Sequence, residues 1–433
     1  MKTIYTYLFS LTAILFISSC SDKYSEELTM NVPVYMDYAT LRSAVKPAQT
    51  RDLVHPGKIC FKDQYLLIVE YLEGVHVIDV SNPASPQNRV FIEIPGCVDI
   101  ALKGNFLYAD SYVDLVTIDL SDIDHPTEKS RLKDVFPYTV PVAENEKLPY
   151  AAVEQGKGIV VSWEAKREKH ELERNNYPSY PIYMYADKNS NEFYSLASSG
   201  GGVDSGSSAS FGKTGSMARF GLYDNYLYIA NNYMLYLFEV KDTGAAPVKI
   251  GTQSVGNVET LFVYDNHLFF GTPSGMLVYD LKIPTVPQSV RNFWHVTSCD
   301  PVVIQDGYAY ITLRSGTACN SSAINRLDVV KCSGDYTQFN LINSYPMAEP
   351  YGLGIDGNVL FICDGKAGLK VYDATDKANI GAHLLASFPN IQTYDVIPAN
   401  GYLFMIGDDG FYLYDYSDIQ HIHLLGQIPV AKQ

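Results

Sequence analysis

Acidic side chains recur at two kinds of position in this 433-residue chain, directly before and directly after short apolar runs. Those before a run are Asp99, Glu259, Asp300 and Asp395, and those after a run are Glu70, Asp110, Asp364, Asp408 and Asp409. Grouped carboxylates can bind a hard cation such as Ca²⁺, and a facing pair can hydrolyse a glycosidic bond. The alternative is that these acids only cap turns or pair with lysines. Since the chain has no DxDxDG loop, the cofactor stays unknown and Ca²⁺ is one candidate.

Aromatic residues add to the candidate ligand-binding groups. Trp163 and Tyr177 stand near Glu164 in an irregular stretch, and aromatic rings beside acids suit stacking on a sugar ring. The charged run at positions 166–174, between them, is interpreted as a solvated helical turn held by pairs such as Arg167 and Glu171. The sequence therefore includes Trp163 and Tyr177 in the predicted ligand-binding set.

Other motifs carry less chemistry. Residues 352–357 match GxGxxG, but a strand pattern follows them where a dinucleotide site needs a helix. His421 and His423 are interpreted as solvated side chains of an outer strand. Because HExxH, GxSxG and CxxC patterns are absent from the sequence, no catalytic residue and no metal ligand is assigned. Cys299 and Cys319 are predicted to form a disulfide, because both fall in loops of one repeat.

A turn signal shows how these residues are positioned. Eight times, a pair rich in Asp, Asn and Gly precedes alternating apolar residues, which predicts a hairpin whose turn needs positive φ angles. The eight pairs begin at Asp63, Gly104, Gly156, Asp224, Asp265, Asp306, Asp356 and Asn400.

A second signal follows about 15 residues after most turns, where a β-rich run ends in an acid, as at Asp79 and Asp280. We expect that acid to accept a hydrogen bond from the next turn. Asp224, Asp265 and Asp306 are 41 residues apart, which is the period of a four-stranded propeller blade. The sequence predicts an all-β protein with one β-propeller of eight four-stranded blades over residues 51–433. Seven blades is the alternative, because the third and sixth repeats depart from the pattern.

In a propeller, the connections between strands b and c and those between blades open on one face, here called the top face. The irregular segments of this chain fall on that face, and function concentrates in such loops. The predicted ligand-binding residues are Asp99, Asp110, Trp163, Tyr177, Glu259, Asp300, Asp364, Asp395 and Asp408.

The first twenty residues predict export. Lys2 precedes an apolar stretch at positions 8–17 that is too short to span a bilayer. Ile17-Ser18-Ser19-Cys20 then resembles a lipobox, which predicts lipidation of Cys20 after removal of a signal peptide at positions 1–20. Residues 21–50 are predicted to be a polar tether with one short helix. We expect an outer-membrane lipid anchor with display on the cell surface, the alternative being an anchor that faces the periplasm.

The repeat sequence from Gly74 to Pro86, GVHVIDVSNPASP, resembles the LVIVD repeat of bacterial exported propellers. Gly275–Asp280 and Gly368–Asp373 are similar, and the segment from Pro33 to Val45 resembles an uncharacterised group of Bacteroidetes lipoproteins. The resemblance implies a propeller and brings no catalytic residues with it.

The net charge of −16 excludes a nucleic-acid groove and disfavours adhesion to anionic lipid, so the membrane is contacted only through the N-terminal lipid. A binding module for a glycan, a peptide or an envelope protein is the leading hypothesis. A carboxylate-dependent glycan hydrolase or lyase is the first alternative, and a structural subunit of an envelope complex is the second.

Overall fold

The computed structural model describes residues 23–173, 200–201, 213–216, 218–294, 301–315 and 324–431. The chain divides into two compact units. One comprises Met1–Asp37 with Val140–Asp187, and the other comprises Tyr38–Thr139 with Lys188–Gln433. Over the described ranges, no helix combines the length and the hydropathy that a membrane crossing needs.

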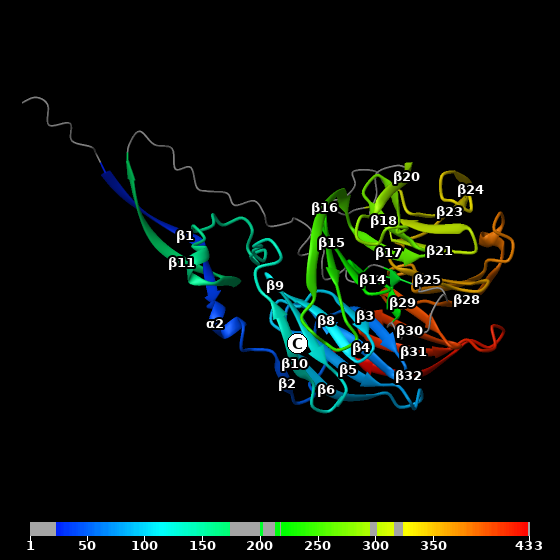
Figure 1. Cartoon of the computed structure of the whole chain (residues 1–433), viewed down its shortest axis with the longest axis horizontal. Helices are drawn as coiled ribbons and strands as arrows, with labels where there is room; N and C mark the ends of the chain where they lie inside the picture. The colour runs from blue at the N-terminus through cyan, green and yellow to red at the C-terminus, as the bar shows by residue number, and fades with distance from the viewer. Residues whose placement is uncertain are drawn as a thin grey trace, which may run out of the picture. The chain divides into compact units, whose positions relative to one another are not determined.

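The first unit contains a long two-stranded antiparallel sheet of β1 (Lys23–Met36) and β11 (Ile159–Glu173), shown in Figure 1. The short 3-10 helix η1 (Gln155–Lys157) precedes β11. Gly158 then adopts a φ of +128°, and a Cβ atom at this position would lie 2.1 Å from the carbonyl oxygen of Met36. This glycine therefore allows the chain to enter β11 directly against the end of β1.

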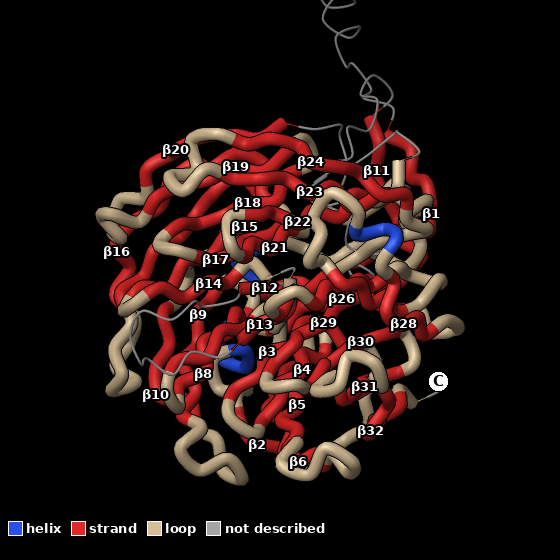
Figure 2. Tube along the Cα trace, turned by 90° about the vertical axis from the view of Figure 1, so that its right-hand side faces the viewer, coloured by secondary structure: helices blue, strands red, loops and turns tan. Residues whose placement is uncertain are grey.

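The second unit is a ring of seven sheets, which Figure 2 shows face-on. Each sheet is one blade, and strands a to d run outward from the centre. The first blade consists of β3 (Pro56–Lys62), β4 (Tyr65–Glu70), β5 (Gly74–Asp79) and β6 (Gln87–Glu93), the second of β7 (Ile100–Lys103), β8 (Phe106–Ser111), β9 (Asp114–Asp119) and β10 (Thr127–Leu132), and the third of β14 (Phe220–Tyr223), β15 (Tyr226–Glu239) and β16 (Val248–Val258). The fourth blade consists of β17 (Thr260–Tyr264), β18 (His267–Thr272), β19 (Gly275–Asp280) and β20 (Gln288–Trp294), and the fifth of β21 (Val302–Gln305), β22 (Tyr308–Leu313), β23 (Arg326–Cys332) and β24 (Phe339–Pro346). The sixth blade consists of β25 (Leu353–Asp356), β26 (Val359–Cys363), β27 (Leu369–Asp373) and β28 (Leu384–Phe388), and the seventh of β29 (Thr393–Ala399), β30 (Tyr402–Gly407), β31 (Gly410–Asp415) and β32 (His423–Pro429).

Two blades differ from the others. In the third blade, β15 runs as one strand through the positions of strands b and c, pairing first with β14 and then with β16. The first blade gains strands at both edges. Its outer strand β6 pairs with β2 (Lys46–Ala48), which follows the short helix α2 (Tyr38–Leu41). Its inner strand β3 pairs with β13 (Lys213–Gly215), which pairs with β12 (Gly200–Gly201) near the centre of the ring (Figure 2).

The prediction of eight blades is wrong, since the structure has seven. The missing blade is the third predicted repeat, which begins at Gly156. Its apolar residues lead into β11, and that strand pairs with β1 from the start of the chain instead of forming a hairpin with its own neighbours. The charged run that begins at Lys166 lies within β11, so its interpretation as a helical turn is also wrong.

The predicted turn chemistry of the other seven repeats is confirmed, and the predicted role of the acid that ends strand c is confirmed in five of them. A residue with positive φ stands in each of their predicted a–b turns, as at Asp63, Asp224 and Asn400. The acid that ends strand c accepts a hydrogen bond from the backbone two residues later in five blades. These bonds join Asp79 to Ser81, Asp119 to Ser121, Asp280 to Lys282, Asp373 to Thr375 and Asp415 to Ser417, at 2.8–3.2 Å. Such Asx turns fix the entry into strand d.

The ring closes between its first and last blades. Leu53, which is fully buried, forms a parallel bridge with Val430, and its carbonyl accepts a hydrogen bond of 2.8 Å from Ala431. The rings of Phe61 and Phe404 stack across the same junction with centroids 4.2 Å apart. A single apolar cluster therefore joins the two ends of the propeller sequence, and neither terminal blade buries its faces alone.

Candidate functional site

An acid at the end of strand b fixes the top-face loop of its own blade in three blades. In each case the carboxylate accepts hydrogen bonds from two consecutive backbone N–H groups that precede strand a. Glu70 accepts from Val54 and His55, Asp110 from Val98 and Asp99, and Asp364 from Ala348 and Glu349. The bonds to Asp110 and Asp364 are 2.7–3.0 Å long. We call these three residues the anchor acids.

Glu70 is the most heavily engaged of them. Its carboxylate is buried and also lies 3.1 Å from Nε2 of His76, which is fully buried. Hydrogen bonds from His76, Val54 and His55 outweigh burial and hold the pKa of Glu70 below its usual value. Since residues 53–55 also close the ring, this carboxylate stabilises the junction of the first and last blades.

Asp99 and Lys58 form a buried ion pair near the axis of the ring. The Nζ of Lys58 lies 3.2 Å from Oδ2 of Asp99, and both side chains are almost fully buried. The same oxygen accepts a hydrogen bond of 2.5 Å from the backbone N–H of Arg219. Burial lowers the pKa of Lys58, an effect that the charge of Asp99 opposes. The carboxylate of Asp99 is therefore bound by groups of the protein itself.

Asp395, at the start of the last blade, has one oxygen bonded and one unpaired. Its Oδ1 accepts hydrogen bonds from the backbone N–H and the hydroxyl of Ser216, at 3.1 and 3.2 Å. Its Oδ2 is buried and has no hydrogen-bond partner. Burial raises the pKa of Asp395 to about 7, and burial raises that of Asp110 to about 7 as well.

Exposed carboxylates lie on the top face of the sixth and seventh blades. Asp408 accepts a hydrogen bond from the hydroxyl of Tyr394, and half-buried Glu349 accepts one of 3.2 Å from the hydroxyl of Tyr351. The two tyrosine rings are buried and meet edge to face with centroids 5.2 Å apart. We call these four residues the tyrosine–acid patch. Burial, together with Asp408, raises the pKa of Tyr394, so that its hydroxyl stays a hydrogen-bond donor.

The surroundings of the patch include a cation and a further acid. The guanidinium of Arg314 lies over the ring of Tyr351 at 4.1 Å from its centroid. Exposed Asp409 accepts a hydrogen bond of 2.6 Å from the hydroxyl of Tyr412. Buried tyrosines thus orient carboxylate oxygens that remain open to solvent on this part of the top face.

The other predicted site residues lie elsewhere. Trp163 belongs to the first unit, where its indole N–H donates to the carbonyl of Pro141 at 2.6 Å and its ring meets that of Tyr150 edge to face. Glu259 is half-buried in front of β17. The predicted residues outside the described ranges are Cys20, Tyr177, Cys299, Asp300 and Cys319.

The structure therefore divides the predicted ligand-binding set. It brings Asp99 and Asp110 together, since Asp110 bonds to the backbone N–H of Asp99. Asp364 and Asp408 lie on neighbouring blades, one as an anchor and one in the patch. Sequence reasoning missed Lys58, Ser216 and Tyr394. Lys58 was a detectable signal, because it is a charged residue directly before the apolar run at positions 59–61 of a strand and stands 41 residues before Asp99.

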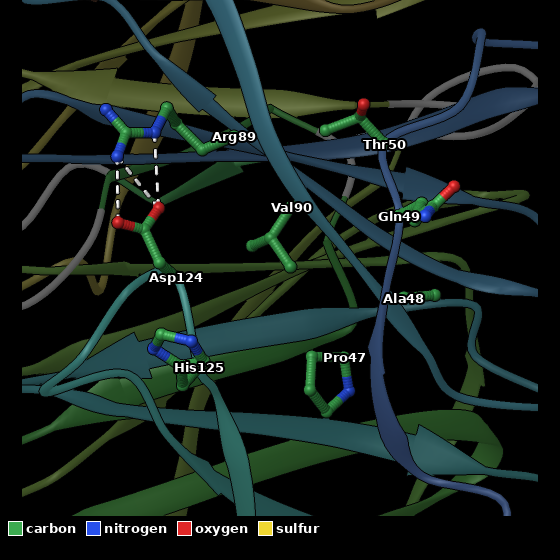
Figure 3. Close-up of a pocket in the computed structure, with 8 residues that line it drawn as sticks. All are labelled: Pro47, Ala48, Gln49, Thr50, Arg89, Val90, Asp124 and His125. Atoms are coloured by element: carbon green, nitrogen blue, oxygen red, sulfur yellow. Dashed lines mark hydrogen bonds and ion pairs between the residues drawn. The ribbon is translucent and has the colours of Figure 1, made fainter.

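A shallow groove lies on the outside of the first two blades. It has a volume of about 500 Å³ and is lined by residues 47–50 with Arg89, Val90, Asp124 and His125. Figure 3 shows the guanidinium of Arg89 facing the carboxylate of Asp124. The Nη2 of Arg89 donates to both carboxylate oxygens of Asp124, each at 2.8 Å. Because this pair spans the groove and satisfies both charges, the groove offers no free charged group from these two residues.

Cys60, Cys97, Cys332 and Cys363 are buried free thiols, and burial raises the pKa of Cys60 to about 12. Such thiols are poor nucleophiles and poor metal ligands at neutral pH. In the part of the chain that the structure describes, no three residues among His, Cys, Asp and Glu are grouped closely enough to hold a metal ion.

Comparisons with known proteins agree with this architecture. Residues 58–89 and 97–134, which span the first two blades, match the model of the LVIVD repeat. No curated protein matches the chain. The chain is similar to a protein of known structure from Lactobacillus plantarum, with 11% identity, 87% of this chain and 97% of that chain covered, and a TM-score of 0.50.

Two further solved structures give lower scores. The periplasmic gluconolactonase of Pseudomonas aeruginosa has 10% identity over 87% of this chain and 97% of that chain, with a TM-score of 0.49. The computationally designed Ika8 protein has 11% identity over 87% of this chain and 90% of that chain, with a TM-score of 0.46. By its own sheet topology the chain is a seven-bladed β-propeller, and it contains LVIVD repeats.

Proposed function

We propose that this protein is a lipid-anchored binding protein of the bacterial cell envelope, displayed on the cell surface, which binds a glycan through the top face of its propeller. The tyrosine–acid patch carries the proposal. Asp408 and Glu349 present carboxylate oxygens to solvent, and buried tyrosines hold them in place. Sugar hydroxyls donate to carboxylates, and preorganised acceptors bind them at a smaller entropic cost than mobile ones.

A glycan array tests this binding function. The purified chain is compared with the double variant Glu349→Ala/Asp408→Ala, which removes both carboxylate acceptors and keeps the tyrosines. A matched control is Asp124→Ala, since Asp124 is an exposed acid of a c–d turn, on the opposite face. We expect the double variant to lose bound glycans and the control to keep them. If both variants retain the same glycans, the patch is not the site, and if only basic peptides bind, the ligand class is wrong.

The anchor rests on the sequence up to Cys20. Replacing Cys20 with Ala should move the protein from the membrane fraction to the soluble fraction, because the lipid is the proposed attachment. Mass spectrometry of the wild-type protein should find a mature N-terminus at Cys20 that carries a lipid. An unchanged membrane fraction, or a different mature N-terminus, contradicts the proposal. Protease treatment of intact cells then separates surface display from an anchor that faces the periplasm.

A glycan hydrolase or lyase is the second candidate, and the raised pKa values of Asp110 and Asp395 favour it. A carboxyl group with a pKa near 7 suits a general acid. Hydrolysis of the glycans found on the array, followed by product analysis, tests this candidate. Activity that Asp395→Asn abolishes would establish catalysis, whereas binding without turnover supports the binding protein.

A further inference from the structure

The residues before the third blade cross the centre of the ring to reach the first blade. Strand β13 pairs antiparallel with β3, with Lys213 opposite Phe61 and Thr214 opposite Cys60. The neighbouring strand β12 contacts the inner strands β17 and β21, and β13 contacts β29. We call the described residues of this stretch, 213–216, 218 and 219, the plug segment. It is bound to the inner edge of the first blade as an added strand, the way a peptide is bound in β-augmentation.

The walls of the ring hold the plug segment through its backbone and one hydroxyl. Asp395 of the seventh blade accepts from the N–H and the hydroxyl of Ser216, and Asp99 accepts from the N–H of Arg219. The N–H of Leu353, in the sixth blade, donates to the same hydroxyl at 2.7 Å. These contacts recognise the backbone N–H groups of Ser216 and Arg219 and one small hydroxyl, directly after strand β13.

The wall beside Ser216 is built for close approach. A Cβ atom at Gly352 would lie 2.1 Å from Oδ1 of Asp395 and 2.8 Å from the carbonyl oxygen of Tyr394. A larger residue at this position would therefore displace the carboxylate that binds Ser216. Glycine here is required by packing against a binding group rather than by the turn chemistry of the repeat.

The plug segment satisfies only part of this site. Oδ2 of Asp395 is fully buried and accepts no hydrogen bond, although a buried carboxylate oxygen is normally paired. Burial raises the pKa of the same group to about 7, as expected for a carboxylate with an unmet acceptor. An extended ligand with one more N–H donor would satisfy Oδ2 of Asp395 as well.

We propose that the centre of the top face is a binding site for an extended peptide with a small hydroxyl residue, and that the plug segment is its built-in occupant. A free peptide must displace a segment that is present at a high effective concentration, so wild-type protein binds such peptides weakly. The site adjoins the tyrosine–acid patch, since Asp395 follows Tyr394 in the chain, but its binding groups are Asp395, Asp99 and the N–H of Leu353, none of which belongs to the patch. This proposal therefore stands or falls independently of glycan binding.

The test uses the full chain and a fluorescent peptide with the sequence KTGSMAR, which copies residues 213–219. Ser216→Pro in the protein removes both the N–H and the hydroxyl that bind Asp395 and leaves the walls intact. Fluorescence anisotropy should show that this variant binds the peptide at least about ten-fold more tightly than wild type. Ser216→Ala, which keeps the N–H, should lie between the two.

The matched control is a KTGPMAR peptide, which should fail to bind any of the proteins. A folded Ser216→Pro protein that binds KTGSMAR no better than wild type, or that binds both peptides equally, overturns the proposal. If that variant does not fold, hydrogen exchange of wild-type protein decides. The amides of Thr214, Ser216 and Arg219 should then exchange at least about ten-fold faster than those of β3, because a displaceable segment opens locally. Equal protection would make the plug part of the core and overturn the proposal.

Discussion

Asp364 and Asp408 follow the second strand of neighbouring blades, yet they have different surroundings. Asp364 is buried and accepts two backbone hydrogen bonds from the loop that enters its blade. Asp408 is exposed and accepts one bond from a tyrosine hydroxyl. In the seventh blade the corresponding loop is held differently, because the N–H of Asp408 donates to the carbonyl of Gln392 at 2.9 Å. One repeat position thus supplies a structural anchor in one blade and a solvent-facing acceptor in the next.

This comparison shows how a repeat scaffold acquires a site. Where an acid at the end of strand b fixes the loop, its carboxylate accepts hydrogen bonds from the backbone of that loop and stabilises the fold. Where the backbone alone fixes the loop, the same acid is left to face solvent, and the tyrosines beneath it set its direction. The predictions below test this division, beginning with the anchor that has the most partners.

Replacing Glu70 with Ala should cause the largest loss of stability. The substitution leaves His76 and the N–H groups of Val54 and His55 without their acceptor, and each buried unsatisfied group costs about 1–3 kcal/mol. Urea unfolding should therefore show a loss of about 3 kcal/mol or more. The control is Glu73→Ala, which removes an exposed pair with Arg51 worth about 0–1 kcal/mol. Similar losses for both variants would refute the role of Glu70 at the ring closure.

The pH dependence of stability should distinguish the buried acids from one another. Asp395 titrates at about 7 in the folded protein and at 3.8 without burial, so the folded state holds the proton more tightly. Its contribution to stability therefore falls as the pH rises from about 4 to 7. The pKa of Glu70 is lowered, so its contribution is present above its unfolded pKa and is lost as the pH falls through the folded value.

Thermal unfolding of Asp395→Asn from pH 4 to pH 8 measures this slope. The variant should lose less stability than wild type as the pH rises, although Asp110, with a similar pKa, retains part of the slope. An unchanged profile for Asp395→Asn would show that Asp395 titrates in its ordinary range.

Much of the fold could be predicted from local chemistry. The a–b turns need positive φ, so seven blades are visible as Asp, Asn and Gly at fixed offsets, and in five of them the acid that ends strand c accepts a hydrogen bond from the next turn. The prediction of an eighth blade was wrong for a non-local reason. The strand that begins at Ile159 carries a repeat-like turn, but its partner is the strand that ends at Met36, more than a hundred residues away in sequence. Strand register between distant segments is set by tertiary packing, which a repeat pattern does not record.

The sequence predicted which face of the propeller carries the candidate site, but it did not predict which residues of that face are exposed. The position of an acid relative to its strand placed Asp99, Asp364, Asp395 and Asp408 on the top face. Their burial depends on partners that no local pattern indicates, such as Ser216, which reaches Asp395 from 179 positions away. Exposed and buried acids therefore look alike in the sequence, and only the packing of neighbouring blades separates them.

The most direct test of this division is the thermal unfolding of Asp364→Ala and Asp408→Ala, measured side by side at pH 7. Asp364→Ala leaves two backbone N–H groups without this acceptor, at about 1–3 kcal/mol each, and should destabilise the protein by about 2 kcal/mol or more. Asp408→Ala should stay within about 0.5 kcal/mol of wild type, as exposed substitutions usually do. Equal stabilities of the two variants, or a greater loss for Asp408→Ala, would contradict the division into anchors and solvent-facing acids.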